Sequence, residues 1–246
     1  MDLSSCIIFF VAWFAGSFVN GVSGLGAALL SLPFISLVVG LEVAVPSSCI
    51  VACFISAFLA WMYRKGCLFR EVLVMGVGSL PGAALGALAL KMLPAQWLCL
   101  GLGVLLLLFV VWQLHGHKIS GTEKMPHRPI LSFLFGGFGG FGNAAVGIGG
   151  PPLAIYATLQ NWDKDEARGT FGVYYLVMAI VTVVFQAFQG LYTEAVFETA
   201  MWSIPGAMAG LVASIPCARS IRQESFKKIL LVIVGGSGLL MLYRGF

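Results

Sequence analysis

The sequence is poor in charged residues, which make up only 10% of its 246 positions. Soluble domains average about 25% charged residues. Here 59% of the residues are hydrophobic and the mean hydropathy is +0.97. Such a composition is typical of membrane proteins and leaves little length for a separate soluble domain. The net charge of +4 does not indicate nucleic-acid binding, because the lysines and arginines lie between apolar runs, where they set membrane topology.

Charge is also missing from the middle of every long apolar run. The nearest charged residues, such as Glu42, Glu71 and Arg219, lie near the ends of the runs. Ionisable groups inside a membrane usually mark the path of a cation or a proton. Their absence favours a small anion held by backbone dipoles and neutral side chains. It also argues against an enzyme, because an intramembrane enzyme needs a nucleophile or paired acids at depth.

The six cysteines and three histidines form no pattern typical of a metal site. Cys49 and Cys53 share a helical face but have no His or carboxylate neighbours, and His115 and His117 lack a fixed fourth ligand. Gly24-Leu-Gly26 is not a nucleotide-binding fingerprint, because no strand or βαβ unit surrounds it. We therefore expect no metal and no cofactor. The N-terminus has no basic stretch before its first apolar run, so a cleaved signal peptide is not expected.

Long apolar runs define the expected architecture, because a spanning helix needs about 20 apolar residues. Full-length runs cover residues 44–63, 71–91, 95–114, 169–189, 196–217 and 228–244. Two further apolar regions, 3–41 and 130–160, are interrupted by glycine-rich phrases, and most of the resulting pieces are too short to cross. We expect these two regions to form broken or re-entrant helix pairs. The predicted fold class is an all-α polytopic membrane protein.

Two phrases occur twice in the chain and indicate an internal duplication. Asn20-Gly-Val-Ser-Gly24-Leu-Gly26 returns 123 residues later (20 to 143) as Asn143-Ala-Ala-Val-Gly147-Ile-Gly149. Ser79-Leu-Pro-Gly-Ala-Ala-Leu-Gly86 returns 124 residues later (79 to 203) as Ser203-Ile-Pro-Gly-Ala-Met-Ala-Gly210. A duplicated apolar chain with matching breaks indicates a substrate site where the repeats meet. The expected units are repeat 1 at 1–114, a linker at 115–129 and repeat 2 at 130–246.

Loop charges predict that the two repeats are inverted in the membrane. The 64–70 loop is basic and should be cytoplasmic, whereas its equivalent near 190–196 has no Lys or Arg and should be outside. The linker at 115–129 is also basic and should be cytoplasmic. Segment 130–160 would then enter from the cytoplasmic side and segment 3–41 from the outside. This arrangement places the N-terminus outside.

The glycine-rich breaks are the candidate substrate site. Glycine reaches positive φ without steric cost and proline stops a preceding helix, so a helix should end and another begin within 142–152. The first turn of the new helix presents free N–H groups and a partial positive charge, which can bind an anion without a charged side chain. The candidate binding residues are Asn20, Ser23, Gly24, Gly26, Asn143, Gly147, Gly149, Gly150 and Pro151. Close helix packing is the alternative role of the glycines.

Four further residues are candidates for the pathway to this site: Arg168, Thr170, Ser47 and Tyr174. Arg168 can attract anions at the cytoplasmic mouth, and its alternative role is that of a snorkelling anchor. A buried hydroxyl in a membrane helix more often bonds the carbonyl of its own preceding turn, which weakens the other three as ligands.

At these residues the chain resembles the sulfite exporter TauE/SafE family of membrane permeases. The resemblance covers nearly the whole chain and rests on five features. They are Gly16 to Gly26, Pro33, Gly147-Ile-Gly-Gly-Pro-Pro-Leu153, Glu166-Ala-Arg168, and the Ser-x-Pro-Gly-Ala phrase of both halves. It implies transport of a small sulfur-containing anion (sulfite, thiosulfate or a sulfonate) or another organic anion across the plasma (inner) membrane of a prokaryote.

These observations predict a transporter for a small anion, bound at the glycine-rich breaks. Its expected partners are that anion and the lipid bilayer, with no nucleic acid; a homodimer stays open. An uncoupled anion channel of the same fold is the alternative function. A membrane scaffold protein is a more distant one, because it gives no reason for two matched breaks.

Overall fold

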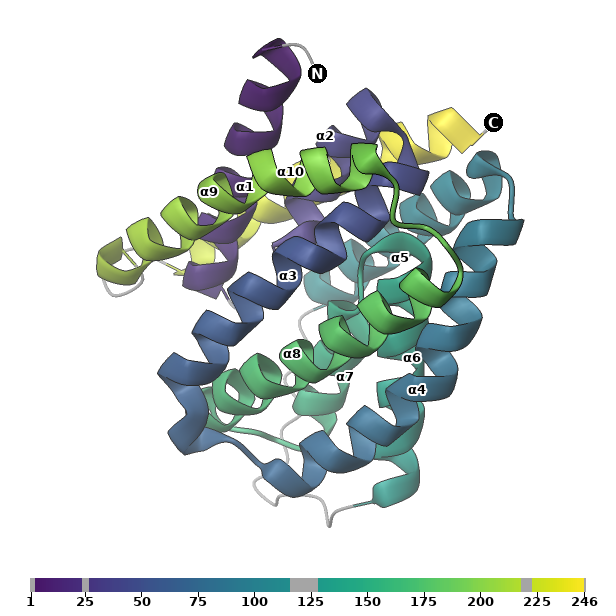
Figure 1. Ribbon diagram of the computed structural model, residues 1–246. Coiled ribbons are helices and arrows are strands. Elements are labelled where there is room, and N and C mark those ends of the chain that lie inside the picture. The colour runs from purple at the N-terminus through teal and green to yellow at the C-terminus, as the bar shows by residue number, and fades with distance from the viewer. Residues whose placement is uncertain (1–2, 24–26, 116–127, 218–222, 246) are drawn as a thin grey trace.

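The computed structural model describes the chain apart from residues 1–2, 24–26, 116–127, 218–222 and 246. The described residues form ten α-helices and one short 3-10 helix, Arg64–Gly66 (Figure 1). The helices are α1 (Leu3–Ser23), α2 (Ala28–Val39), α3 (Leu41–Tyr63), α4 (Phe69–Met92), α5 (Ala95–Leu114), α6 (Pro129–Val146), α7 (Gly150–Leu159), α8 (Lys164–Phe188), α9 (Glu194–Cys217) and α10 (Gln223–Gly245).

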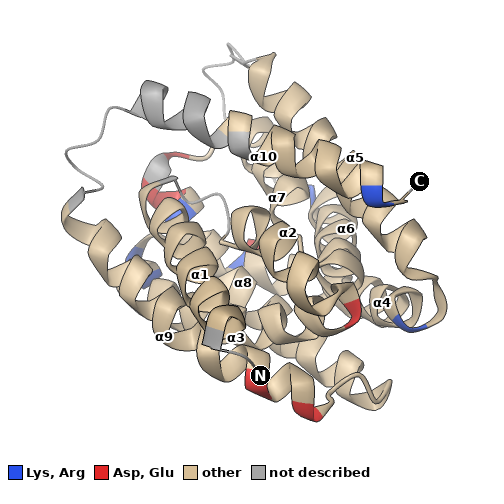
Figure 2. Cartoon of the chain, turned by 90° about the horizontal axis from the view of Figure 1, so that it is seen from above, with Lys and Arg blue, Asp and Glu red and all other residues tan. Residues whose placement is uncertain are grey.

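Seven of the described helices, α1, α3, α4, α5, α6, α8 and α9, are long and apolar enough to cross a membrane. Charged residues are few and scattered among them (Figure 2). Helices α2 and α7, with 12 and 10 residues, are shorter. At about 1.5 Å per residue neither reaches across the ~30 Å hydrocarbon core. The expected all-α, polytopic membrane architecture is confirmed.

Each glycine-rich region forms one long and one short helix. Helix α1 is followed by α2, and α6 is followed by α7, with the second break between Val146 and Gly150, inside the predicted range of 142–152. Helix α6 is longer than its sequence suggests, because the glycines near its middle continue the helix instead of ending it. Those glycines lie against a neighbouring helix: Gly136 meets the backbone of Met75 and Gly140 that of Ser79.

The helices of each half of the chain pack mainly against helices of the other half. Helix α4 of the first half packs along α6 of the second, and α9 of the second packs along α1 of the first. The next most extensive contacts join α3 with α8 and α5 with α10, which are also matching elements of the two halves. Every one of these four contacts joins one half to the other, so neither half has a separate core.

The α4–α6 and α1–α9 contacts differ in register by about one helical turn. Gly82 of α4 faces the backbone oxygen of Gly137 of α6. Its equivalent Gly206 (82 + 124) would face Phe14 (137 − 123) if the contacts matched, but it faces the oxygen of Phe10. The neighbouring contacts show the same shift of four residues. In the α4–α6 contact, Gly78 meets Phe133 and Gly86 meets Ala144. In the α1–α9 contact, Gly210 meets Phe14 and Gly21 meets Ser214. The two halves therefore match in topology but differ in the relative position of the paired helices along their axes.

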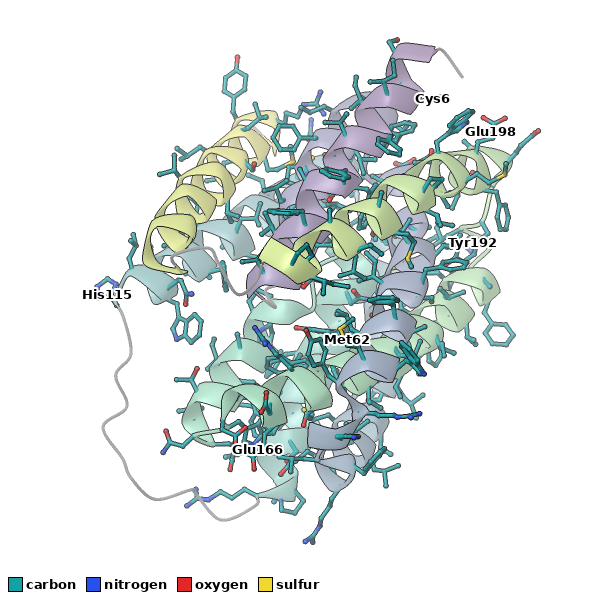
Figure 3. All side chains as sticks on the ribbon, turned by 90° about the vertical axis from the view of Figure 1, so that its left-hand side faces the viewer. Cys6, Met62, His115, Glu166, Tyr192 and Glu198 are labelled. Carbon is teal, nitrogen blue, oxygen red and sulfur yellow. The ribbon has the colours of Figure 1, made fainter. Side chains whose placement is uncertain are left out.

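The basic 64–70 loop, predicted to be cytoplasmic, lies beside the start of α8 at one end of the bundle. Gly66, in the basic 64–70 loop, approaches the backbone oxygen of Asp165. Glu166 lies near this end, whereas Cys6 and Glu198 lie near the opposite end (Figure 3). The topology prediction requires this grouping. The inverted arrangement and the outward N-terminus stay predictions.

Candidate functional site

A small cavity of about 70 Å³ lies where the two broken helix pairs meet. It is enclosed by residues of α1, α2, α3, α6, α8 and the break between α6 and α7. One water needs only ~10–15 Å³ by this measure, so the cavity has room for a group of a few heavy atoms. Its described lining contains no Asp, Glu, Lys or Arg. The polar lining consists of amides, hydroxyls, an indole and backbone groups.

Five pairs of the lining residues are separated by 123 positions, the offset of the repeated asparagine phrase. They are Asn20 and Asn143, Ala27 and Gly150, Ala52 and Tyr175, Ile55 and Met178, and Ser56 and Ala179. Equivalent positions of the two halves thus converge on one space. This is the geometry expected of a site at a repeat interface.

The second break is built around Gly147, which has a left-handed backbone with φ of +72°. Its N–H donates to Asn143 O at 3.0 Å and Ile148 N–H donates to Gly142 O at 3.1 Å, which satisfies carbonyls at the end of α6. An L-residue is strained in this conformation. A Cβ here would also lie 3.0 Å from Leu32 and 3.1 Å from Ser48. Glycine is therefore favoured at this position for two separate reasons.

Two short helices begin at the cavity. The first residues of α2 (Ala28 and Leu29) and of α7 (Gly150) line it, and neither helix has a side-chain cap at its N-terminus. The N–H groups of a first helical turn carry a partial positive charge. Two such ends therefore lie at one cavity whose described lining carries no charged side chain.

Gly149 is closely packed between α6 and α8. A Cβ at Gly149 would lie 2.6 Å from the backbone oxygen of Gly139 and 2.8 Å from Cε of Met178. The first contact is with backbone, which cannot move aside as a flexible side chain can. The start of α7 is therefore locked between α6 and α8.

Five of the predicted binding residues line the cavity: Asn20, Asn143, Gly147, Gly149 and Gly150. Pro151 is buried in the first turn of α7 but is not part of the lining. Ser23 is the last residue of α1, and its side chain lies outside the described part of the structure. Gly24 and Gly26 also lie outside the described residues.

None of the four predicted pathway residues lines the cavity. Arg168 lies over the ring of Tyr63, with 5.7 Å from Cζ to the ring centroid. Thr170 accepts a hydrogen bond from Leu68 N–H at 3.0 Å. Ser47 donates to the carbonyl of Ala44 in its own helix. Tyr174 donates to the backbone oxygen of Gly136, at 3.0 Å. All four have packing partners, and their place in a pathway stays a prediction.

Asn143 begins a line of polar contacts along α8. Its amide donates to Thr182 Oγ1 at 3.0 Å, and one turn further Gln186 donates to the backbone oxygen of Ala144 at 3.1 Å. Tyr192, in the loop after α8, donates to Gln186 Oε1 at 3.1 Å. Burial raises the pKa of the Tyr192 phenol well above its ordinary value, so the hydroxyl keeps the proton that it donates. The Thr182 contact orients the Asn143 side chain, and Gln186 ties the end of α6 to α8.

Sequence reasoning missed several lining residues, among them Trp13, Ser56 and Tyr175. Ser56 and Tyr175 lie in runs that are otherwise apolar, and only the crossing of α3 and α8 brings them to the cavity. The repeat offset supplies a usable signal, because Ser56 pairs with Ala179 across 123 residues.

Glu71 forms a second polar cluster away from the cavity. It lies in the first turn of α4, as its place near the end of an apolar run suggests, yet it is only 7% exposed. Ser132 of α6 donates to its carboxylate at 2.7 Å and Tyr156 of α7 at 2.9 Å. This carboxylate links the first turn of α4 to both members of the second broken pair.

Comparison with known proteins finds one family. The sequence model described as "Sulfite exporter TauE/SafE" matches residues 8–241. No curated protein matches the chain, and no solved structure does. The matched range includes both glycine-rich breaks and all the residues that line the cavity.

Proposed function

The chain belongs to the sulfite exporter TauE/SafE family, and on that premise we propose that it carries a small anion bound in the cavity between the two breaks. The observation that carries the proposal is the convergence of five equivalent pairs of residues, including both asparagines, on one space. A cavity made from matching positions of two halves is the place where a carrier can hold its substrate in either state.

The chemistry of the lining supports an anion as the substrate. The first turns of α2 and α7 supply partial positive charge, and Asn20 and Asn143 bring side-chain amides to the lining. The Asn143 amide donates to Thr182 Oγ1, and its second acceptor is the weak one, Cys49 Sγ at 3.9 Å, which an anion oxygen would replace. A cation would need carboxylates or a cluster of oxygens, and the described lining has no carboxylate. Gly147, Gly149 and Gly150 let the backbone approach the substrate, and Pro151 starts α7. Ser23, Gly24 and Gly26 are the proposed counterparts in the first half.

The size of the cavity favours a compact substrate. A volume of about 70 Å³ suits an ion of a few heavy atoms. Sulfite fits this limit best, and thiosulfate and the smallest sulfonates follow. Larger organic anions would require the cavity to widen. We therefore propose sulfite or a similar small oxyanion as the substrate class, carried across the plasma membrane of a prokaryote.

Binding measurements on the purified full-length protein test this function. We expect sulfite, thiosulfate or methanesulfonate to raise the melting temperature in a concentration-dependent way, whereas choline and potassium should not. At 100 times Kd a ligand stabilises a protein by about 2.7 kcal/mol. Asn143→Ala should weaken the effect about 10- to 100-fold, the amount expected for one hydrogen bond to a charged group. Absence of stabilisation by every anion would contradict the proposal.

The difference in register between the halves supports a carrier over a channel. Suppose that the α4–α6 contact took the register of the α1–α9 contact and the reverse. Each half would then have the conformation that the other half has now, and the two membrane-facing ends of the bundle would be interchanged. A rocking of one half about the crossing of α3 and α8 would shift both contacts together. The cavity lies beside this crossing, so it would open first to one side and then to the other.

Distance measurements between spin labels test this exchange. Leu85 of α4 and Phe138 of α6 are both exposed to lipid, and so are Val11 of α1 and Val212 of α9. We expect each labelled pair to show two distances, because the contacts slide by about one turn of 5.4 Å. Sulfite should change the populations at both pairs together. A single, unchanging distance at both pairs would exclude the exchange.

Orientation and assembly complete the proposal. We propose that the N-terminus lies outside and that the loop at 64–70 lies in the cytoplasm, because its Lys and Arg residues favour that side. The loop at 161–168, with Lys164 and Arg168, is proposed to lie on the same side. The division into repeats at 1–114 and 130–246 follows from the same pattern. A homodimer stays a prediction, since the contacts described above lie within a single chain.

A further inference from the structure

Trp13 is the most unusual group at the cavity. It lies in α1, two turns before Asn20, and only 1% of it is exposed. Both residues line the cavity, and their spacing of seven places them on one face of the helix. The indole Nε1 has no hydrogen-bond partner among the described residues. Tryptophan N–H groups usually find a partner when they are buried.

An orphaned indole has a restricted choice of ligand. The group is donor-only, so it can be satisfied by an acceptor and by nothing else. A cation or an ammonium group offers it no acceptor, whereas each oxygen of an oxyanion does. Hydrogen bonds from a neutral donor to a charged acceptor are also stronger than those between neutral groups. An oxygen of a bound anion can supply the missing partner.

The second half of the chain has no equivalent of this donor. The position that matches Trp13 is Gly136 (13 + 123), and its Cβ position is occupied by the backbone of Met75 on α4. An indole cannot be placed there without separating α4 from α6. The backbone of the cavity is thus duplicated, whereas the indole comes from the first half alone.

We propose that the indole N–H of Trp13 binds an oxygen of the transported anion and makes the cavity selective for oxyanions. This inference rests on the proposed function and names the side-chain donor of its site. Ser17, one turn further along α1, is also buried without a partner, but it does not line the cavity. The assignment is therefore made for Trp13 only.

Replacement of Trp13 by phenylalanine tests the proposal, because it removes the N–H and keeps an aromatic ring. Titration calorimetry of the purified protein with sulfite should show affinity lower by about 10- to 100-fold, the amount expected for one hydrogen bond to a charged group. Trp97→Phe is the matched control, because Trp97 is 63% exposed and does not line the cavity. It should leave the affinity unchanged.

A spectroscopic readout separates binding from a structural role. The chain has six tryptophans, so protein labelled with ¹⁵N-tryptophan gives six indole resonances. The resonance absent from Trp13→Phe should move when sulfite is added to the wild-type protein. Should that variant fail to fold, single replacement of the other five tryptophans identifies the same resonance by elimination.

The outcomes distinguish this proposal from the function on which it rests. If the wild-type protein binds none of sulfite, thiosulfate and methanesulfonate, the proposed function fails. If it binds sulfite while the Trp13 resonance stays in place and Trp13→Phe binds equally well, the function stands and the role of Trp13 is wrong. A resonance that moves equally with potassium chloride would show binding of a simple halide, and it would overturn the selectivity for oxyanions.

Discussion

Gly149→Val is expected to reduce transport of sulfite by proteoliposomes to background. A Cβ at this position meets the backbone oxygen of Gly139 at 2.6 Å, and the valine methyl groups would add to the contact with Met178. Since Gly149 lies between the cavity and the start of α7, the added bulk must displace the first turn of that helix. Overpacking of this kind costs about 1–3 kcal/mol. The variant should therefore still insert and fold, with a lowered melting temperature.

The control for this experiment is Gly101→Val in α5. A Cβ at Gly101 has nothing within 4 Å, so the same change of side chain meets open space. Gly101→Val should transport sulfite at the wild-type rate. If Gly149→Val were also to transport normally, the break between α6 and α7 would not be part of the site.

Gly147→Ala and Gly190→Ala form a second pair, in which backbone strain is the same and packing differs. Both glycines have φ of +72°. An alanine in the left-handed conformation costs about 1–2 kcal/mol. At Gly190 that is the whole effect, because nothing lies within 4 Å of its Cβ position, whereas at Gly147 the Cβ also meets Leu32 and Ser48. We expect both variants to lose stability and Gly147→Ala alone to lose transport.

Melting temperature and sulfite flux measured on the same preparations check this expectation. The lowered stability of Gly190→Ala serves as the reference, since nothing lies within 4 Å of its Cβ position and Gly190 does not line the cavity. Equal flux in the two variants would show that the conformation of Gly147 has no role beyond folding. Loss of flux in both would assign the defect to general instability.

The sequence predicted the architecture and the location of the site better than the identity of its ligands. Apolar run length is a local property, so the spanning helices could be predicted directly. Asn20 and Asn143 could be found because duplication repeats a phrase and a repeat interface brings the copies together. The break between α6 and α7 followed from the conformations that Gly147 and Pro151 favour.

The features that were missed depend on contacts between distant helices. A tryptophan in an apolar run is typical of a membrane-interface anchor. Only the packing of α1 shows that the indole of Trp13 is buried without a partner. The burial of Glu71 likewise depends on Ser132 and Tyr156, which lie on two other helices. Conversely, Arg168 and Thr170 have polar chemistry that suits a pathway, yet their contacts are with Tyr63 and Leu68.

If the proposed site is correct, the neutral lining of the cavity would make the carrier responsive to membrane voltage. With no charged side chain in the described lining to offset the bound anion, each loaded crossing would move net negative charge. A potential that is negative inside favours outward movement by about 2.3 kcal/mol per elementary charge for every 100 mV. The resting potential of the cell would then drive export by itself, without a coupling ion. Direction in such a protein would be set by the electric field across the membrane and not by an asymmetric site.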